Sequence, residues 1–193
     1  MEHTETILAV ITGIGLSAAC GFRIFVPLLL LNLASMYGYV NLTSGFEWIG
    51  GYYATITFAV ATVLEISAYY VPWLDNVMDA IASPVSIIAG TIAAASVITD
   101  MPPSLKWMVA IIAGGGIAGL LQGSATVLRA KSSLFTGGIG NTVVATFELV
   151  GSVITSLLAI ILPIIGFILV AILAAYLLLR VGRTFFRKIK TGH

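Results

Sequence analysis

The stretch from Val60 to Pro84, VATVLEISAYYVPWLDNVMDAIASP, guides the interpretation of the whole chain. It begins as the end of an apolar run that carries one carboxylate, Glu65, and continues into a short segment with two more, Asp75 and Asp79. If this segment is helical, the two aspartates lie on one face, because residues four apart in a helix are neighbours. Like charges at that spacing repel each other, so solvent, a cation or a proton must offset them. The stretch therefore predicts a polar centre within an apolar protein.

The composition is that of an integral membrane protein. Hydrophobic residues make up 59% of the 193 residues and charged residues 9%, whereas soluble domains have about 25% charged residues. The net charge of +1 does not indicate a nucleic-acid partner. Cys20 is the single cysteine, and both histidines, His3 and His193, are near the ends, so no histidine is placed for a catalytic triad or a zinc site. We therefore expect a membrane protein that is not an enzyme and has no cofactor.

Apolar runs separated by polar or proline-containing breaks predict an all-helical protein with about six transmembrane helices. A helical span needs about 20 mostly apolar residues. The first run, from Ile7 to about Tyr39, is too long for one span and is interrupted near Gly21 and Arg23. The segment with Asp75 and Asp79 is too short and polar to be a span of its own. The predicted spans after the interrupted run cover about 52–71, 84–99, 107–128, 142–162 and 163–179.

The two halves of the chain share short patterns that predict an inverted repeat. The segment Gly13–Gly21, GIGLSAACG, aligns with Gly115–Gly123, GGIAGLLQG, and an Ala-Thr pair precedes both Glu65 and Glu148. Three spans in each half place the second half upside down in the membrane. Inverted repeats with interrupted helices, here the first helix of each half, are typical of transporters. The single transmembrane domain is divided into a first pseudo-repeat (1–100), a second pseudo-repeat (101–182) and a basic tail (183–193).

Lysine and arginine residues near the span ends predict the orientation, because they are enriched on the cytoplasmic side. Six spans place both termini on one side, where seven of the nine basic residues gather, whereas the other side has only Lys106. Both termini are therefore expected in the cytoplasm, with the tail on anionic lipid. The seven basic residues of that side are Arg129, Lys131, Arg180, Arg183, Arg187, Lys188 and Lys190.

Charged and polar side chains within the apolar runs are the candidates for a binding site. A charged residue at the centre of a span costs about 2.5–3.5 kcal/mol on insertion scales, so Arg23, Glu65 and Glu148 must pair or face water. In one interpretation Arg23 meets an anionic group of a substrate, with the two glutamates beside it. In the other, a buried ion pair clamps the two halves together. Gln122 and Asn141 are expected to line the same space. A further alternative is that Glu65 or Glu148 binds the proton that is coupled to transport.

Two further segments are candidates for ion binding. Asp75 and Asp79 could hold a metal cation through carboxylate oxygens, the ligands that calcium and magnesium prefer. The alternative is that they belong to a solvated helix at the membrane surface. Gly137, Gly138 and Gly140 come just before a helix, where backbone amides could bind an anion.

Three blocks of the sequence carry a resemblance to a known family. They are GLSAACGFRIFVPLLLLNLAS (15–35), VPWLDNVMDAIASPVSIIAGTIA (71–93) and GLLQGSATVLRAKSSLFTGGIGNTVVATFE (119–148). Together they resemble a family of bacterial polytopic membrane proteins that is catalogued only as a domain of unknown function. The resemblance implies a multi-pass protein of the bacterial inner membrane. It also adds weight to the candidate residues that lie in the blocks, which are Arg23, Asp75, Asp79 and Glu148.

These observations lead to three functional hypotheses. The first is a small transporter or channel for an ion or small solute, with a buried polar centre at the repeat interface and coupling to a cation or proton. The second is the passage or binding of a phosphate-bearing lipid such as polyprenyl phosphate. The third is a substrate-binding membrane subunit of a larger transporter. The expected partners are the lipid bilayer and the ion, solute or anionic lipid, and a homodimer is considered because one small bundle has little interior.

Overall fold

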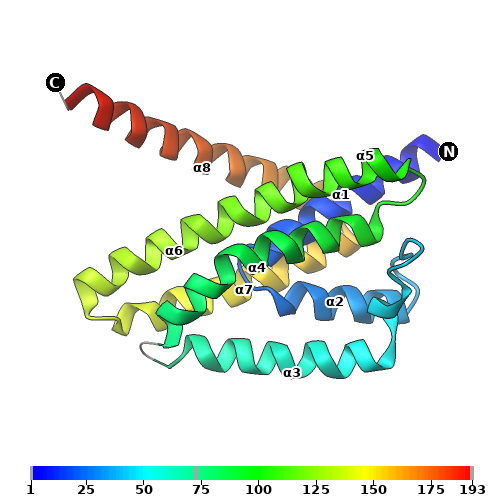
Figure 1. The fold of residues 1–193 in the computed structure, drawn as a ribbon, viewed down its shortest axis with the longest axis horizontal. Helices are drawn as coiled ribbons and strands as arrows, with labels where there is room; N and C mark the ends of the chain where they lie inside the picture. The colour runs from blue at the N-terminus through cyan, green and yellow to red at the C-terminus, as the bar shows by residue number, and fades with distance from the viewer. Residues whose placement is uncertain (1, 72–73, 192–193) are drawn as a thin grey trace.

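The computed structural model describes residues 2–71 and 74–191, and within these residues it is helical with no strand (Figure 1). This confirms the all-helical fold class. The elements are α1 (Glu2–Cys20), α2 (Phe25–Met36), the 3₁₀ turn η1 (Glu47–Gly50), α3 (Tyr52–Tyr69), α4 (Leu74–Val97), α5 (Pro103–Val109), the π-helical turn η2 (Ala110–Gly115), α6 (Gly116–Thr136), α7 (Ile139–Ile161) and α8 (Pro163–Thr191).

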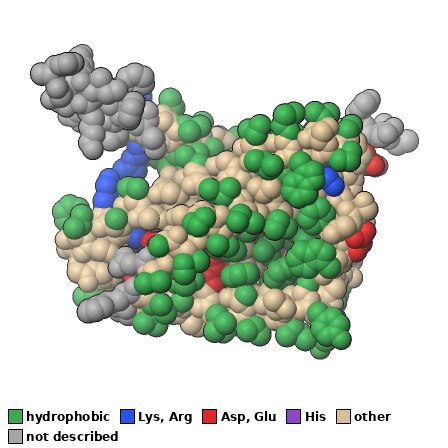
Figure 2. Space-filling view, in the orientation of Figure 1, with side chains coloured by type: hydrophobic (Ala, Val, Ile, Leu, Met, Phe, Trp, Pro, Cys, Tyr) green, Lys and Arg blue, Asp and Glu red, His purple; other side chains and the backbone are tan. Residues whose placement is uncertain are grey.

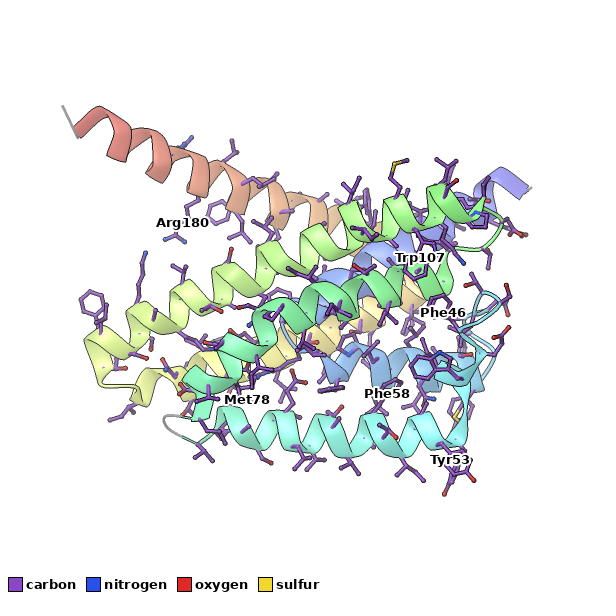
Figure 3. All side chains as sticks on the ribbon, in the orientation of Figure 1. Phe46, Tyr53, Phe58, Met78, Trp107 and Arg180 are labelled. Atoms are coloured by element: carbon purple, nitrogen blue, oxygen red, sulfur yellow. The ribbon has the colours of Figure 1, made fainter. Side chains whose placement is uncertain are left out.

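Several helices have the length and composition of membrane spans. Within the described residues, four stretches qualify, Val77–Val97, Pro103–Thr136, Ile139–Ile161 and Pro163–Arg180. The outer surface is rich in hydrophobic side chains (Figure 2). Exposed aromatic residues, Tyr53 among them, gather at one end of the bundle, as aromatic belts do at membrane interfaces (Figure 3). The chain is therefore a multi-helix membrane protein, and the six-span inverted repeat is not confirmed.

The first apolar run folds back on itself. Gly13 lies against Ala94, and the hydroxyl of Ser17 donates a hydrogen bond to the carbonyl oxygen of Gly90, so α1 runs antiparallel to α4. Residues 21–24 break the helix about halfway along the bundle. From there α2 returns towards the end at which α1 begins (Figure 1). The expected interruption is present, and it turns the chain round in the interior. We refer to residues 21–24 as the helix break.

Helix α4 corrects the prediction for the segment that carries the two aspartates. The helix begins at Leu74 and continues through Pro84, so Asp75 and Asp79 lie in the first turns of a long helix. Pro84 was predicted to open a span, but it is accommodated inside α4. The hydroxyl of Ser83 donates to the carbonyl oxygen of Asp79, and that of Ser86 donates to the carbonyl oxygen of Ser83. Proline is tolerated inside membrane helices more often than inside soluble ones.

Helices α5 and α6 form one long path with a π-helical turn between them. A Cβ atom on Gly114 would lie 2.8 Å from Cβ of Ala94, and one on Gly115 would lie 2.6 Å from the hydroxyl of Thr91. Small residues therefore allow η2 to approach α4 closely. Helix α6 then continues to Thr136, so Arg129 belongs to this helix and not to a connecting loop as predicted.

The beginning of α1 and the end of α8 lie at opposite ends of the bundle (Figure 1). This arrangement differs from the predicted one, in which both termini lie on the same side. The reason is the hairpin of α1 and α2, which returns the chain to its starting end before α3 begins. It also makes α1 and α6 run in the same direction, which a simple inverted relation between the two halves would not give.

Gly21 provides a test of how closely the helix break packs on α6. A Cβ atom there would lie 2.6 Å from the carbonyl oxygen of Ala118 and 2.7 Å from Cβ of Leu121. We expect Gly21→Val to lower the free energy of unfolding by about 1–3 kcal/mol, the usual cost of overpacking. Thermal unfolding in detergent measures the change.

Gly123 is the matched control, because no atom lies within 4 Å of the position of a Cβ there. Gly123→Ala is expected to be neutral or to stabilise by about 0.5–1 kcal/mol, as for glycine in other helices. Equal stability of Gly21→Val and the parent protein would contradict the close packing of the helix break.

Candidate functional site: a buried charge cluster

Five segments bring charged and aromatic side chains together inside the bundle. Each of these side chains belongs to a residue that is 6% exposed or less, so the site is closed to lipid and solvent in this conformation. We call these six residues the charge cluster. They are Arg23 of the helix break, Glu65 and Tyr69 of α3, Asp79 of α4, Arg129 of α6 and Glu148 of α7.

Arg129 is the centre of the charge cluster. Its Nη1 donates a hydrogen bond to Oδ1 of Asp79, and its Nη2 donates to Oε2 of Glu148. The guanidinium carbon lies 4.2 Å from the centroid of the Tyr69 ring, a cation–π contact. The hydroxyl of Tyr69 in turn donates to Oδ1 of Asp79 over 3.3 Å. Arg129 therefore links α3, α4, α6 and α7.

Arg23 reaches the same group from the helix break. Its Nη2 donates to the carbonyl oxygen of Ala145 over 2.9 Å and lies 3.6 Å from Oε2 of Glu148. Its guanidinium carbon is 3.9 Å from the centroid of the Tyr69 ring. The two arginines therefore share one aromatic ring and one carboxylate. This arrangement places the predicted pair of Arg23 and Glu148 together.

Glu65 is held by backbone amides at the start of α2. Its Oε1 accepts from the N–H of Ile24 at 2.8 Å, and its Oε2 accepts from the N–H of Phe25 at 3.0 Å. The first amides of a helix have no partner within the helix and carry a partial positive charge. Glu65 therefore caps α2 from another helix and fixes the geometry of the helix break. Its charge is compensated without a direct arginine partner.

A second polar group lies between the charge cluster and one end of the bundle. The side-chain amide of Asn141 donates to Oδ2 of Asp75 at 2.6 Å and to the hydroxyl of Ser133 at 2.8 Å. Asp75 is one turn before Asp79 in α4, and the other two residues lie near the turn between α6 and α7. We call Asp75, Ser133 and Asn141 the outer polar triad.

The candidate metal ligands have separate partners. Asp79 pairs with Arg129, whereas Asp75 accepts from Asn141. Among the residues that the structure describes, no group of three or more His, Cys, Asp or Glu side chains is arranged to hold a metal ion. Asp79 therefore belongs to the charge cluster and Asp75 to the outer polar triad.

The glycine-rich segment forms a turn between helices. Gly137 and Gly138 have φ angles of 62° and 95°, which glycine adopts without strain. The N–H of Gly140 donates to the hydroxyl of Thr136 at 2.9 Å. Gly137 and Gly138 connect α6 to α7, and Gly140 lies in the first turn of α7. Among the hydrogen bonds of the described residues, none joins an amide of these glycines to the charge cluster.

Half of the unpartnered buried polar atoms of the described residues belong to the charge cluster, and the other half belong to Thr62, Gln122, Thr126 and Asn141. Within the described chain, eight buried side-chain nitrogen or oxygen atoms have no hydrogen-bonding partner in the protein. Native structures satisfy the great majority of such groups, so a concentration of exceptions marks a place where water or a ligand completes the set. The atoms belong to Arg23 (Nε and Nη1), Arg129 (Nε), Glu148 (Oε1), Thr62 (Oγ1), Gln122 (Nε2), Thr126 (Oγ1) and Asn141 (Oδ1).

Two members of the charge cluster were missed from the sequence. Arg129 was counted as a charge at a membrane surface, although Gln122 stands two helical turns before it on the same buried face of α6. Tyr69 follows Glu65 by four residues, which places both on one face of α3. Helical spacing from the predicted polar residues would have found both.

Residues 10–183 of the chain match the family model described as "Domain of unknown function (DUF4126)". The match confirms the predicted resemblance to a membrane-protein family catalogued in this way. No curated protein and no solved structure matches the chain. The activity must therefore be argued from the site itself.

Arg129→Met tests whether the bundle depends on the central guanidinium. The substitution leaves Asp79 and Glu148 buried without their main counter-charge. We expect a loss of about 3–5 kcal/mol in the free energy of unfolding, as for other buried ion pairs broken on one side. Unfolding in detergent measures it, with the exposed Lys131→Met as a control that should have no effect. A fully stable Arg129→Met protein would show that the carboxylates do not need this partner.

Proposed function

We propose a transport function for this chain, which belongs to the DUF4126 family and is built from membrane-type helices. In this proposal the charge cluster binds a small solute, together with a coupling ion, during its passage across the membrane. The four unpartnered buried atoms of the charge cluster, on Arg23, Arg129 and Glu148, carry the proposal. A cluster that only holds helices together is stable when every donor and acceptor is satisfied, because a partly satisfied buried network is costly.

The helix break supports a binding role over a purely structural one. Non-helical backbone at membrane depth is tolerated where it is buried in protein or lines a cavity. In many transporters, discontinuous helices of this kind form the substrate site near the middle of the membrane. Here the break places the Arg23 side chain in the charge cluster and brings the first amides of α2 to the carboxylate of Glu65.

The pairing of Glu148 supports ion coupling. Three carboxylates and two guanidinium groups lie in the charge cluster, and the carboxylate of Glu65 is met by the start of α2. Asp79 and Glu148 then balance the two arginines, and Glu148 is the carboxylate that both arginines approach. A proton or cation that binds Glu148 would change the pairing of both arginines at once. We therefore assign the coupling role to Glu148.

The distribution of charge supports an orientation in a bacterial inner membrane. Lys131 lies near the end of α6, before the turn to α7. Arg180 lies towards the far end of α8 (Figure 3). The opposite end has Glu47, Asp100 and a single lysine, Lys106. Because basic residues are enriched on the cytoplasmic side, we place the end of α8 in the cytoplasm and the beginning of α1 outside. The outer polar triad then faces the cytoplasm.

A second candidate is the passage of a phosphate-bearing lipid. An open apolar groove of about 510 Å³ runs between α8 and the helix formed by η2 and α6, lined by residues such as Ile112, Leu120 and Leu178. A groove of this kind on the outer surface suits an acyl or prenyl chain. The same charge cluster would then have to receive the headgroup.

Charge movement in proteoliposomes tests the transport function. Purified protein is reconstituted into liposomes, which are adsorbed on a solid-supported membrane. The current is recorded after a jump in the concentration of protons, of sodium ions or of potassium phosphate. We expect the parent protein to give a current that Glu148→Gln abolishes. The substitution removes the charge that we assign to coupling but keeps the size of the side chain.

Lys106→Gln is the control, because Lys106 lies at the other end of the bundle and should leave the current unchanged. Gel filtration of each variant shows whether it is folded. Currents from the parent protein that do not exceed those of protein-free liposomes, for every jump, would contradict the proposal and favour a structural clamp.

A further inference from the structure

The eight unpartnered buried atoms of the described chain, four of which belong to the charge cluster, are mainly hydrogen-bond donors. Four are N–H groups, Nε and Nη1 of Arg23, Nε of Arg129 and Nε2 of Gln122. Two are threonine hydroxyls, which donate or accept. The two remaining atoms, Oδ1 of Asn141 and Oε1 of Glu148, are acceptors. A buried surplus of N–H donors is complementary to a ligand that consists mostly of oxygen acceptors.

We infer that the charge cluster binds a phosphate group, with Arg23 as its main ligand. The inference rests on the proposed transport function and names the class of solute. Hydrogen bonds from guanidinium to phosphate are charge-assisted and about twice as strong as neutral ones. The four oxygens of a phosphate group offer more than enough acceptors for the three unpartnered N–H groups of the charge cluster, which belong to Arg23 and Arg129. A metal cation in their place would face two guanidinium groups at close range.

Arg23 has more free donor capacity than Arg129. Arg129 directs both terminal nitrogens at carboxylates. Arg23 makes one hydrogen bond to a neutral carbonyl, and its nearest carboxylate, that of Glu148, is 3.6 Å away and shared with Arg129. Because Arg23 is 1% exposed, neither water nor lipid at the surface reaches its other N–H groups in this conformation. Its charge is therefore the one best placed to receive an anion.

Gln122 adds a neutral donor on the neighbouring helix. It is 2% exposed and lies on the buried face of α6, next to Leu121, which Gly21 of the helix break approaches. Arg129 follows seven residues later, about 10 Å along the helix axis. The face of α6 that meets the helix break thus has an unpartnered donor at each end. Gln122, Arg129 and Arg23 are each 2% exposed or less, so all of these donors are buried.

The outer polar triad gives the charge cluster a polar approach from one end. Asp75, Ser133 and Asn141 lie between the charge cluster and the end near the α6–α7 turn. On the other side of the helix break the buried side chains of the described residues carry no charge, and most are apolar, Leu16 and Leu31 among them. A phosphate group would therefore enter past the outer polar triad, after the hydrogen bonds of Asn141 separate.

A thermal-unfolding titration tests the inference. The protein is placed in nanodiscs of phosphatidylcholine, and inorganic phosphate is added against sodium chloride of equal ionic strength. A ligand that binds only the folded state raises the melting temperature with its concentration. We expect phosphate to raise it in the parent protein, and Arg23→Lys to remove the rise, because lysine keeps the charge but loses the donors of the guanidinium.

Gln122→Leu is a second variant, and it tests the inference even if substitution of Arg23 prevents folding. It removes a donor with no partner in the protein, so we expect a folded protein with a weaker response to phosphate. Lys131→Gln is the control for general attraction of anions to the same end of the bundle, and it should respond as the parent does.

A second arm distinguishes the source of the phosphate group. Part of the phosphatidylcholine is replaced by phosphatidic acid, without free phosphate in solution. A response to inorganic phosphate that depends on Arg23 supports a soluble phosphate-bearing solute, and one confined to phosphatidic acid supports a lipid headgroup. The absence of a rise in both arms, or equal rises in the parent and Arg23→Lys, overturns the inference. In that case a current that depends on Glu148 would still support the transport function.

Discussion

The pairing of Arg129 with both Asp79 and Glu148 is the interaction on which the interior depends. It joins α4, α6 and α7 at one point and brings the ring of Tyr69 under the same guanidinium. Such a pairing is a weak source of stability, because removing charges from water costs about as much as their attraction returns. An apolar core would have held the helices equally well. The charges are therefore better explained by a ligand that needs them.

The helix break works together with this pairing. Glu65 fixes the start of α2 through two backbone amides, and the break in turn positions Arg23 against α7. Each carboxylate of the charge cluster is thus matched to a helix end or to a guanidinium group, whereas Arg23 and Arg129 keep unpartnered N–H donors. The partner of each carboxylate is the basis for the proposed division of roles, in which Glu65 supports the backbone and Glu148 couples transport to ions.

Much of the fold and part of the site could be predicted from the sequence, for identifiable reasons. Composition and apolar runs were sufficient for an all-helical membrane protein, and the cost of burying charge pointed to Arg23, Glu65 and Glu148. The direction of α2 could not be predicted. A helix break has the same sequence pattern whether the following helix continues in the same direction or turns back. Arg129 was missed because a basic residue near the end of an apolar run also fits a surface charge, and only the packing of α6 decides between the two.

The most direct test of the central claim, that the charge cluster is a binding site which opens to the cytoplasm, is cysteine accessibility. With Cys20→Ala as background, Ala145→Cys places a thiol beside the carbonyl that Arg23 contacts, and Ala93→Cys places one in the apolar interior. Both alanines are 1% exposed, so neither reacts unless the protein opens. A membrane-impermeant thiol reagent applied from the cytoplasmic side of inverted vesicles should label Ala145→Cys and spare Ala93→Cys. Labelling of neither position, or of both at the same rate, would contradict the account.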